Sequence, residues 1–353
     1  MSRSVRPGTP NRPRTEREGA YDDHVLTEPW TLGGLTVPNR VVLAPLAGIG
    51  TWFVRLQAKR YGAGMATSEM VSSFAIHHRN EKTLGEMLRV DPRERGTGPV
   101  SLQLFGQDPE IMRSAAAYVR EHTDVDVIDI NMGCPVPKVC KTGAGAALLA
   151  DPGTAVAVAR AAREGSGLPV TVKLRSGQRA GERSGAQLAR RLVEDAGVAG
   201  IGFHPRSAQV HHKGTPDYAL AAQLVEELPA PVILSGGLSD AASAQAAYER
   251  TGAAAIMLAR GSLGNPWLFA QLLGDREDEP SESEVLAELD WLMDRAVEHL
   301  GEVRAGRWLR KAYPWYVERL GGGKALQGAM QQTDTVAAAR AVLAGRFTLS
   351  AAA

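Results

Sequence analysis

The chain has 353 residues, of which 44% are hydrophobic and 22% charged, and its 40 basic and 39 acidic residues leave a net charge of +1. These proportions are ordinary for a globular protein and exclude a disordered chain, a fibrous repeat or a coiled coil. Its apolar stretches fall short of the roughly 18 residues of a membrane span, so we expect no membrane partner. The Arg-rich N-terminus lacks an apolar segment, which argues against a secretory signal and predicts a cytoplasmic protein.

Metal-ligating residues are scarce. The two cysteines, Cys134 and Cys140, are too few for a disulfide framework or a four-cysteine zinc site. His211 and His212 are adjacent but have no third ligand at metal spacing, so we expect no metal. Nothing in the sequence predicts an oligomer, and a monomer is the default expectation.

Residues 1–23 are rich in Arg, Pro and Thr without apolar periodicity, which predicts a flexible extension. Across residues 24–274, eight short apolar runs have the length and β-branched content of strands buried on both faces. These expected strands are Val41–Leu46, Met65–Met70, Val100–Phe105, Val125–Met132, Val170–Leu174, Gly200–His204, Pro231–Leu234 and Ala255–Leu258.

Amphipathic segments lie between most of these strands. The expected helices are Trp52–Tyr61, Pro109–Glu121, Thr154–Arg163, Gly185–Ala196, Tyr218–Leu228 and Asp240–Arg250, with Asp108, Asp151 and Ser239 as N-caps. Eight strands alternating with helices predict an α/β fold, a (β/α)₈ TIM barrel. A doubly wound sheet is the alternative, but the turn Pro45–Gly48 after the first strand is not a dinucleotide-binding fingerprint.

The pattern changes after Gly274. Residues 275–290 hold eight acidic residues and one Arg, whereas residues 291–353 carry a net charge of +4. Helices are expected at Glu284–Glu302, Trp308–Arg319 and Thr335–Ala344, and no strand pattern appears there. Residues 280–353 are therefore predicted to form a small all-helical domain with an excess of basic residues, the kind of local patch that any nucleic-acid partner would have to meet.

The active site of such a barrel lies at the carboxyl ends of its strands. Barrels commonly bind phosphate on the loops after the last two strands, together with the N-terminus of a short extra helix. Here Gly236-Gly237 permits close backbone approach, Arg260 offers a bidentate donor, and Gly264–Trp267 could begin the short helix. A phosphate-bearing cofactor is the favoured interpretation; the alternative is that these glycines only make tight turns.

Cys134 follows the fourth strand, at the same rim. Free cysteines are most often structural, but this placement favours chemistry. A thiol with an ordinary pKa of about 8.5 is protonated at neutral pH and can act as a general acid. It could instead be a nucleophile if Lys138 lowered its pKa, whereas Cys140 is interpreted as structural. Lys173, at the end of the fifth strand, needs an anion or an electron-rich ring to stay charged when buried.

The strand ends together resemble those of the tRNA-dihydrouridine synthases, in the bacterial branch once described as nitrogen-regulation-like. The most specific run is Asp129–Gly145, supported by Leu102–Gly106 and Arg260–Trp267. The resemblance covers about residues 37–273. It implies an FMN-dependent barrel that reduces the C5=C6 bond of a uridine in tRNA, with NADPH (or NADH) as the electron source.

The resemblance also implies roles for residues of this chain. Cys134 would be the proton donor, and Asn131 and Arg175 would be candidates for holding the target uracil. The residues implied to contact FMN are Pro45, Leu46 and Ala47 under the ring, Gln103 and Lys173 on its pyrimidine side, His204 beside it, and Ser235, Gly236, Gly237, Ala259 and Arg260 at the phosphate.

A uracil inside folded tRNA must be flipped out to reach the barrel. The rest of the tRNA would be held by the helical domain, with Arg304, Arg307, Arg310, Lys311 and Lys324 as candidate contacts. Two other functions stay open on the sequence alone. One is an FMN-dependent barrel acting on a free small molecule, and the other is a non-catalytic RNA-binding protein.

Overall fold

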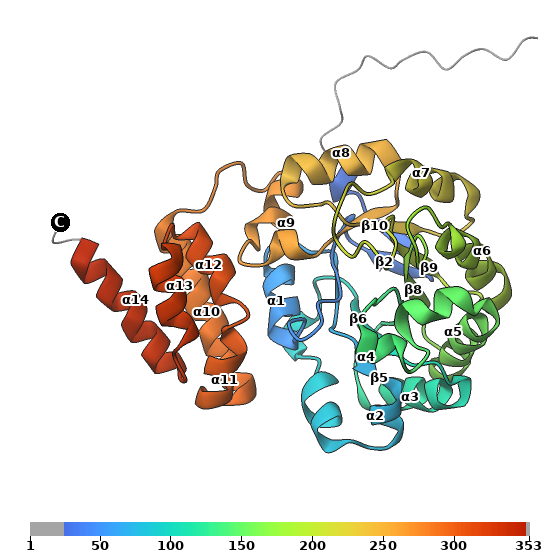
Figure 1. Cartoon of the computed structure of the whole chain (residues 1–353), viewed down its shortest axis with the longest axis horizontal. Helices are drawn as coiled ribbons and strands as arrows, with labels where there is room; N and C mark the ends of the chain where they lie inside the picture. The colour runs from blue at the N-terminus through green and yellow to red at the C-terminus, as the bar shows by residue number, and fades with distance from the viewer. Residues whose placement is uncertain (1–24, 351–353) are drawn as a thin grey trace, which may run out of the picture.

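The computed structural model describes residues 25–350, and the side chains of residues 25–345, so the expected extension at 1–23 lies outside the described residues. Figure 1 shows two parts: a barrel, and beside it a group of helices drawn in orange and red at the C-terminal end of the chain. No helix of the described part is long and apolar enough to cross a membrane.

The predicted TIM barrel is confirmed. Eight parallel strands form a ring that closes because β4 pairs with both β3 and β6. The strands are β3 (Val41–Leu43), β4 (Met65–Thr67), β6 (Val100–Phe105), β7 (Val127–Met132), β8 (Val170–Arg175), β9 (Gly200–His204), β10 (Val232–Ser235) and β11 (Ala255–Leu258). A two-residue strand, β5 (Val71–Ser72), extends the edge of β6. The first two strands are shorter than expected, and Pro45 follows closely on the first.

Helices cover the outside of the ring, as expected. The long ones are α1 (Trp52–Arg60), α3 (Pro109–His122), α5 (Pro152–Ser166), α6 (Ser184–Ala196), α7 (Tyr218–Glu227) and α8 (Ala241–Thr251); the short ones are α2 (Ser73–His77), α4 (Pro137–Cys140) and α9 (Trp267–Leu272). Asp108 and Asp151 are confirmed as N-caps. Ser239 is not the cap of α8, because Asp240 accepts the backbone N–H of Ser243 and completes a capping box one residue later.

A β-hairpin absent from the sequence prediction closes the amino-terminal end of the barrel. It consists of β1 (Trp30–Leu32) and β2 (Leu35–Val37), joined by two glycines with positive φ. Gly33 lies so close to Pro169 and Ala199, just before β8 and β9, that a Cβ there would clash. Trp30 and Leu32 pack into the same buried cluster as residues of the barrel strands, so this end of the barrel is filled.

The tail is all-helical, as predicted, but its helices differ in number and bounds. They are α10 (Glu282–Leu300), α11 (Glu302–Leu309), α12 (Tyr313–Arg319), α13 (Gly323–Gln331) and α14 (Val336–Ser350). The prediction of a single helix at Trp308–Arg319 is wrong. Helix α11 ends at Leu309, and a new helix, α12, begins at Tyr313 with Pro314 in its first turn. Helix α13 was not expected, because glycines 321–323 precede it and weaken the helical pattern.

Helix α1 lies between barrel and tail and is buried on every side from Trp52 to Lys59. Toward the tail, the Gln57 amide donates to Glu288 Oε1 at 2.8 Å and to the Tyr316 hydroxyl at 2.9 Å. Tyr61 donates to the other oxygen of Glu288 at 2.7 Å. The two parts therefore share one continuous core rather than meeting through a solvated linker.

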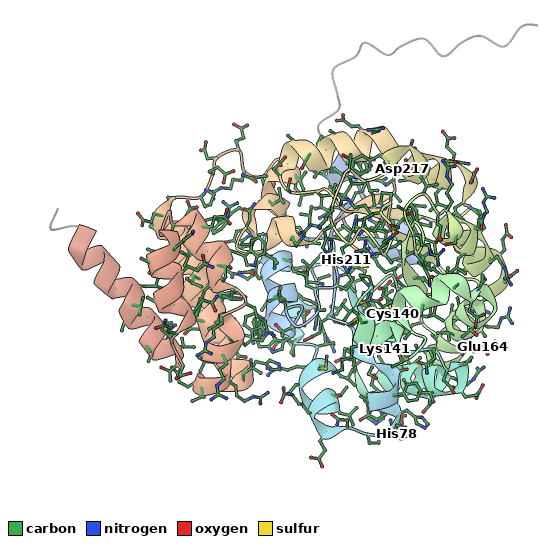
Figure 2. The ribbon with its side chains drawn as sticks, in the orientation of Figure 1. His78, Cys140, Lys141, Glu164, His211 and Asp217 are labelled. Atoms are coloured by element: carbon green, nitrogen blue, oxygen red, sulfur yellow. The ribbon has the colours of Figure 1, made fainter. Side chains whose placement is uncertain are left out.

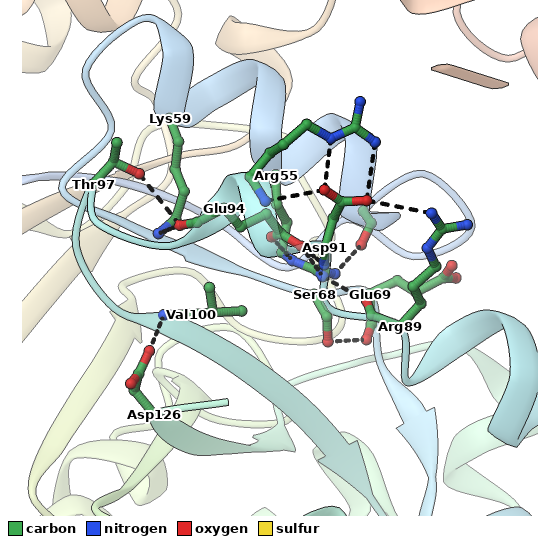
Figure 3. Close-up of polar contacts among 12 residues, drawn as sticks. Arg55, Lys59, Ser68, Glu69, Arg89, Asp91, Glu94, Thr97, Val100 and Asp126 are labelled. Atoms are coloured by element: carbon green, nitrogen blue, oxygen red, sulfur yellow. Dashed lines mark hydrogen bonds and ion pairs between the residues drawn. The ribbon is translucent and has the colours of Figure 1, made fainter. Parts of the chain in front are cut away.

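Toward the barrel, α1 is held by a buried ion pair (Figure 3). Arg55 donates through Nε and Nη2 to the two oxygens of Glu94, at 2.7 and 2.9 Å, and neither side chain is more than 2% exposed. Lys59 donates to the Glu94 carbonyl at 2.9 Å, and burial lowers its pKa to about 8. These contacts fix α1 against the segment that precedes β6, and Arg55 Nη1 also donates to the Gly50 carbonyl of the loop that follows β3, at 3.4 Å.

Acidic and basic residues of the tail region largely pair with one another. Arg276 contacts Glu284 at 2.7 Å, Arg319 contacts Glu279 at 3.0 Å, and Arg340 contacts Asp290 and Asp294 at 2.7 and 2.6 Å. The acidic residues of 275–290 and the basic residues that follow them are thus partly neutralised by ion pairs in the folded protein. The net charge of +4 on the tail is therefore not a free basic surface.

Candidate active site

A cavity of about 940 Å³ opens at the carboxyl ends of the barrel strands. This is near the upper end of the roughly 300–1,000 Å³ found for ligand pockets, so it has room for more than one small group. All fourteen residues singled out from the sequence line it: Pro45, Leu46, Ala47, Gln103, Asn131, Cys134, Lys173, Arg175, His204, Ser235, Gly236, Gly237, Ala259 and Arg260. Their chemical roles stay predictions.

A layer of polar side chains crosses the barrel wall beneath this cavity. Gln103, Asp129 and Thr171 are register partners on β6, β7 and β8. The buried Asp129 carboxylate accepts the Gln103 amide N–H and the Thr171 hydroxyl, each at 2.6 Å. Burial raises the pKa of Asp129, opposed by these two hydrogen bonds and by nearby Lys173. The layer is therefore a paired polar cluster rather than an exposed charge.

Two residues further along β7, toward the cavity, Asn131 continues the network. Asn131 donates through Nδ2 to Gln103 Oε1 at 2.8 Å. Its Oδ1 accepts the backbone N–H groups of Gly133 and Cys134, at 3.2 and 2.9 Å. In this structure the Asn131 amide holds the Gly133–Cys134 backbone, which is a positional role that the sequence alone did not reveal.

Cys134 is half-buried and its backbone is held on both sides. Its carbonyl accepts the Ala146 N–H at 3.0 Å and the Cys140 thiol at 3.3 Å, so Cys140 supports the loop, as the structural interpretation implied. Burial raises the pKa of the Cys134 thiol, while the Val136 backbone N–H and Arg175 oppose this shift with smaller effects. The thiol is therefore protonated at neutral pH, which favours the general acid over the nucleophile.

Arg175 is largely engaged by the protein itself. Its Nε donates to the Gly133 carbonyl at 3.0 Å, and Nη1 donates to the carbonyls of Ser207 and His211 at 3.1 and 2.7 Å. The guanidinium thus ties the Cys134 loop to the loop after β9.

Figure 2 shows His211, Cys140 and Lys141 over the middle of the barrel, whereas Glu164 and His78 lie at its periphery.

Lys173 reaches across the barrel to Ser235, donating to its hydroxyl at 2.8 Å. Gly202, its register partner on β9, makes room for it, since a Cβ there would lie 2.7 Å from Lys173 Cδ. Burial and Arg175 lower the pKa of Lys173 to about 8, against a smaller opposing effect of Asp129. No carboxylate of the described residues pairs directly with this ammonium, so it is available to an electron-rich ligand.

His204 is a neutral imidazole. Burial lowers its pKa far below the ordinary value, and the surrounding cations Lys173, Arg175 and Arg206 lower it further. Gly236 lies against it, with φ near +98°, and a Cβ there would lie 2.3 Å from the imidazole ring. The glycine predicted to approach a phosphate is therefore also required by its contact with His204.

The far end of the cavity offers donors for an anion. Gly237 has φ near +82°, and its backbone N–H has no acceptor among the described residues. Arg260 begins the single turn η5 (Arg260–Ser262), is exposed, and has no ion-pair partner in residues 25–345. The short helix expected after Gly264 is α9, but it begins at Trp267, outside the cavity lining.

Three residues of α12 also line the cavity: Trp315, Glu318 and Arg319. Sequence reasoning assigned this helix to a separate domain and missed them. No local signal could have found them, because the contact depends on how the tail docks: Gly264 packs against Trp315, and Lys311 donates to the Gly48 carbonyl at 2.8 Å. The tail thus forms one wall of the cavity.

Comparison with known proteins agrees with this arrangement. The dihydrouridine synthase family model matches residues 42–351. The tRNA-dihydrouridine synthase B of Xanthomonas axonopodis pv. citri is 33% identical over 81% of this chain and 86% of its own. A probable tRNA-dihydrouridine synthase of Mycobacterium tuberculosis is 34% identical over 86% of this chain and 81% of its own.

Solved structures share the fold at low identity. Morphinone reductase in complex with tetrahydroNAD aligns with a TM-score of 0.51 at 17% identity, covering 74% of this chain and 93% of that one. Histamine dehydrogenase from Rhizobium sp. 4-9 aligns with a TM-score of 0.55 at 11% identity, covering 83% of this chain and 51% of that one. The family match over most of the chain is the stronger finding: the protein belongs to the dihydrouridine synthase family.

Proposed function

We propose that this chain is an FMN-dependent tRNA-dihydrouridine synthase that uses NADPH to reduce the C5=C6 bond of a uridine in tRNA. One observation carries the proposal. A protonated thiol, Cys134, opens into the same cavity as a half-buried ammonium, Lys173, and a set of unpaired anion donors. A reduction across a carbon–carbon double bond needs a hydride donor and a proton donor, and this cavity provides a place for the first and a residue for the second.

The residues present fit a flavin mononucleotide. An ammonium that is half-buried without a carboxylate favours an electron-rich partner, and the pyrimidine side of a flavin provides one for Lys173. At the opposite end, the Gly237 N–H and the Arg260 guanidinium are free to bind a phosphate. Pro45, Leu46 and Ala47 supply a largely apolar wall that could lie under the ring.

When bound, FMN supplies the hydride for C6 of uracil. The role of Cys134 is then defined, because its thiol gives a proton to C5, and burial keeps that proton on the sulfur until it is transferred. Asn131 and Arg175 hold the backbone that carries this thiol, so the donor is preorganised rather than mobile. Their remaining N–H groups can still face a uracil in the cavity.

Most of the basic residues that the tail was expected to offer to tRNA have partners within the protein. Arg304 contacts Glu86 at 2.6 Å, Arg310 donates to the Thr333 carbonyl and to Asp334, and Lys311 is bound to the Gly48 carbonyl. Only Arg307 and Lys324, of the five candidates, are exposed without a partner in the described residues. Three of the five therefore stabilise the fold instead of offering charge to RNA.

Free positive charge is instead present on the barrel loops. Lys138 lies on α4 and Lys141 directly after it, in the segment that follows Cys134, and Lys213 lies on the loop after β9. All three are exposed and have no ion-pair partner among the described residues. Since phosphate contacts supply most nucleic-acid affinity, we expect the tRNA backbone to bind over these loops, which places a flipped uracil at the cavity.

The proton-donor assignment is tested by separating the two half-reactions. Cys134→Ala should leave FMN content and NADPH oxidation unchanged, because neither needs the thiol. Dihydrouridine formation in tRNA should fall by about 10² to 10⁴, the usual contribution of a general acid. The matched control is Cys140→Ser, which keeps a donor to the Cys134 carbonyl. Equal losses in the two variants would contradict the assignment.

The cofactor site is tested at its phosphate end. Arg260→Ala removes a charge-assisted contact and should weaken FMN binding by about 10- to 150-fold. Arg179→Ala is the control, since Arg179 is exposed but does not line the cavity. Fluorescence titration of FMN into the flavin-free protein measures both affinities. An Arg260→Ala affinity equal to that of the control would show that the phosphate does not lie there.

The RNA surface is tested by neutralising one lysine. Lys141→Ala should weaken tRNA binding and make the plot of log K against log salt shallower by about 0.7–0.9, the loss of one phosphate contact. Arg120→Ala, on the outer face of α3, serves as the control because Arg120 is equally exposed and unpaired in the described structure. If the two variants gave the same slope and affinity, Lys141 would not contact the tRNA.

A further inference from the structure

We propose that Asp129 is a positioning residue for the reaction: its carboxylate sets the orientation of two successive side-chain amides and through them places the Cys134 thiol. This inference rests on the proposed role of Cys134 as proton donor. Asp129 itself lies below the cavity and is not among the residues that line it. It can act only through the side chains that stand between it and the cavity.

The first link is the contact with Gln103. A carboxylate accepts hydrogen bonds and cannot donate them, so it selects one of the two orientations of an amide. With Asp129 accepting the Gln103 N–H at 2.6 Å, the Nε2 group must face the carboxylate. The Gln103 oxygen is thereby turned toward Asn131. The Thr171 hydroxyl occupies the other carboxylate oxygen at 2.6 Å and keeps the carboxylate in this position.

The second link repeats the same logic. Because the Gln103 oxygen faces Asn131, the Asn131 amide must present its N–H₂ group to it, as observed at 2.8 Å. The Asn131 oxygen then faces the backbone N–H groups of Gly133 and Cys134. A reversed amide would place N–H₂ against these two N–H groups and lose both bonds. The polarity of the chain of contacts is thus fixed from both ends, by the Asp129 carboxylate at one and by the two backbone N–H groups at the other.

The network ends at the proton donor, where Asn131 is the side chain that accepts the Cys134 N–H, while Arg175 and Cys140 hold the neighbouring carbonyls of Gly133 and Cys134. Gln103, Asp129 and Asn131 are all less than 10% exposed, so water does not readily replace a missing partner. Without Asp129, only the contact with Asn131 holds the Gln103 amide, and a reversed Gln103 would set its N–H₂ against that of Asn131 and weaken the hold of Asn131 on the Cys134 N–H. The expected consequence is a looser Gly133–Cys134 segment with a more accessible thiol.

Thiol alkylation measures this consequence independently of turnover. We would compare the purified wild-type protein with Asp129→Leu, Asp129→Asn and Thr171→Val, following iodoacetamide modification of Cys134 by peptide mass, with Cys140 as the internal reference. Asp129→Leu should raise the rate at which iodoacetamide alkylates Cys134 by roughly 3- to 10-fold, as expected for the loss of one buried hydrogen bond. It should also lower dihydrouridine formation by a larger factor than NADPH oxidation, because NADPH oxidation needs the flavin contact of Gln103 but not the thiol.

The other two variants separate positioning from packing. Asn at position 129 can keep its oxygen on Gln103, because the Thr171 hydroxyl can turn and accept the new N–H, so Asp129→Asn should stay near the wild-type alkylation rate. Thr171→Val removes the hydrogen bond from the Thr171 hydroxyl to Asp129 but leaves the contacts of Gln103 and Asn131 in place. Its Cys134 alkylation rate should also stay near that of the wild type. A Thr171→Val effect equal to that of Asp129→Leu would overturn the proposal, as would a folded Asp129→Leu with unchanged Cys134 reactivity.

Should Asp129→Leu not fold, Gln103→Leu interrupts the chain at its next member and must raise Cys134 alkylation in the same way; an unchanged rate there also overturns the proposal. The two readouts distinguish this inference from the proposed function. If Cys134 were not the proton donor, Asp129→Leu would still change alkylation, but dihydrouridine formation would fall no further than NADPH oxidation.

Discussion

The closure of eight parallel strands into a ring is the constraint on which the site depends. It brings residues from positions 45 to 260 to one opening and places register partners of adjacent strands side by side. The polar layer of Gln103, Asp129 and Thr171 exists only because of this register, and it supports the loop that carries Cys134. The chemistry above the strands is thus organised by hydrogen bonds within them.

Strand positions and strand-end residues were predictable because buried parallel strands have a local signature, a short apolar run followed by glycine or polar residues. Three of the eight strands have the bounds expected, β6, β9 and β11. The hairpin at the closed end was missed although Gly33-Gly34 is a turn signal. The direction of each amide in the cavity wall was beyond prediction, because it depends on donors and acceptors from three strands.

Tertiary pairing of charges reduces the basic surface that the sequence of the tail indicates. Counting residues gave a basic domain, yet Arg304, Arg310 and Arg340 each contact a carboxylate, and Glu288 joins the tail to α1. The tail therefore contributes less as an electrostatic surface than as a cavity wall, through Trp315, Glu318 and Arg319. Its removal would expose the outer face of α1, so barrel and tail form a single functional unit.

The most direct test of the account is the choice of substrate. The purified protein, supplied with FMN and NADPH, would be incubated with unmodified tRNA transcripts or with an equal concentration of free uridine, and the nucleosides would be analysed by mass spectrometry. We predict that uridine in tRNA gains the mass of two hydrogens and that free uridine remains unchanged, because affinity depends on phosphate contacts around the cavity. Reduction of free uridine at an equal rate, or no product in tRNA while NADPH is consumed, would contradict the account.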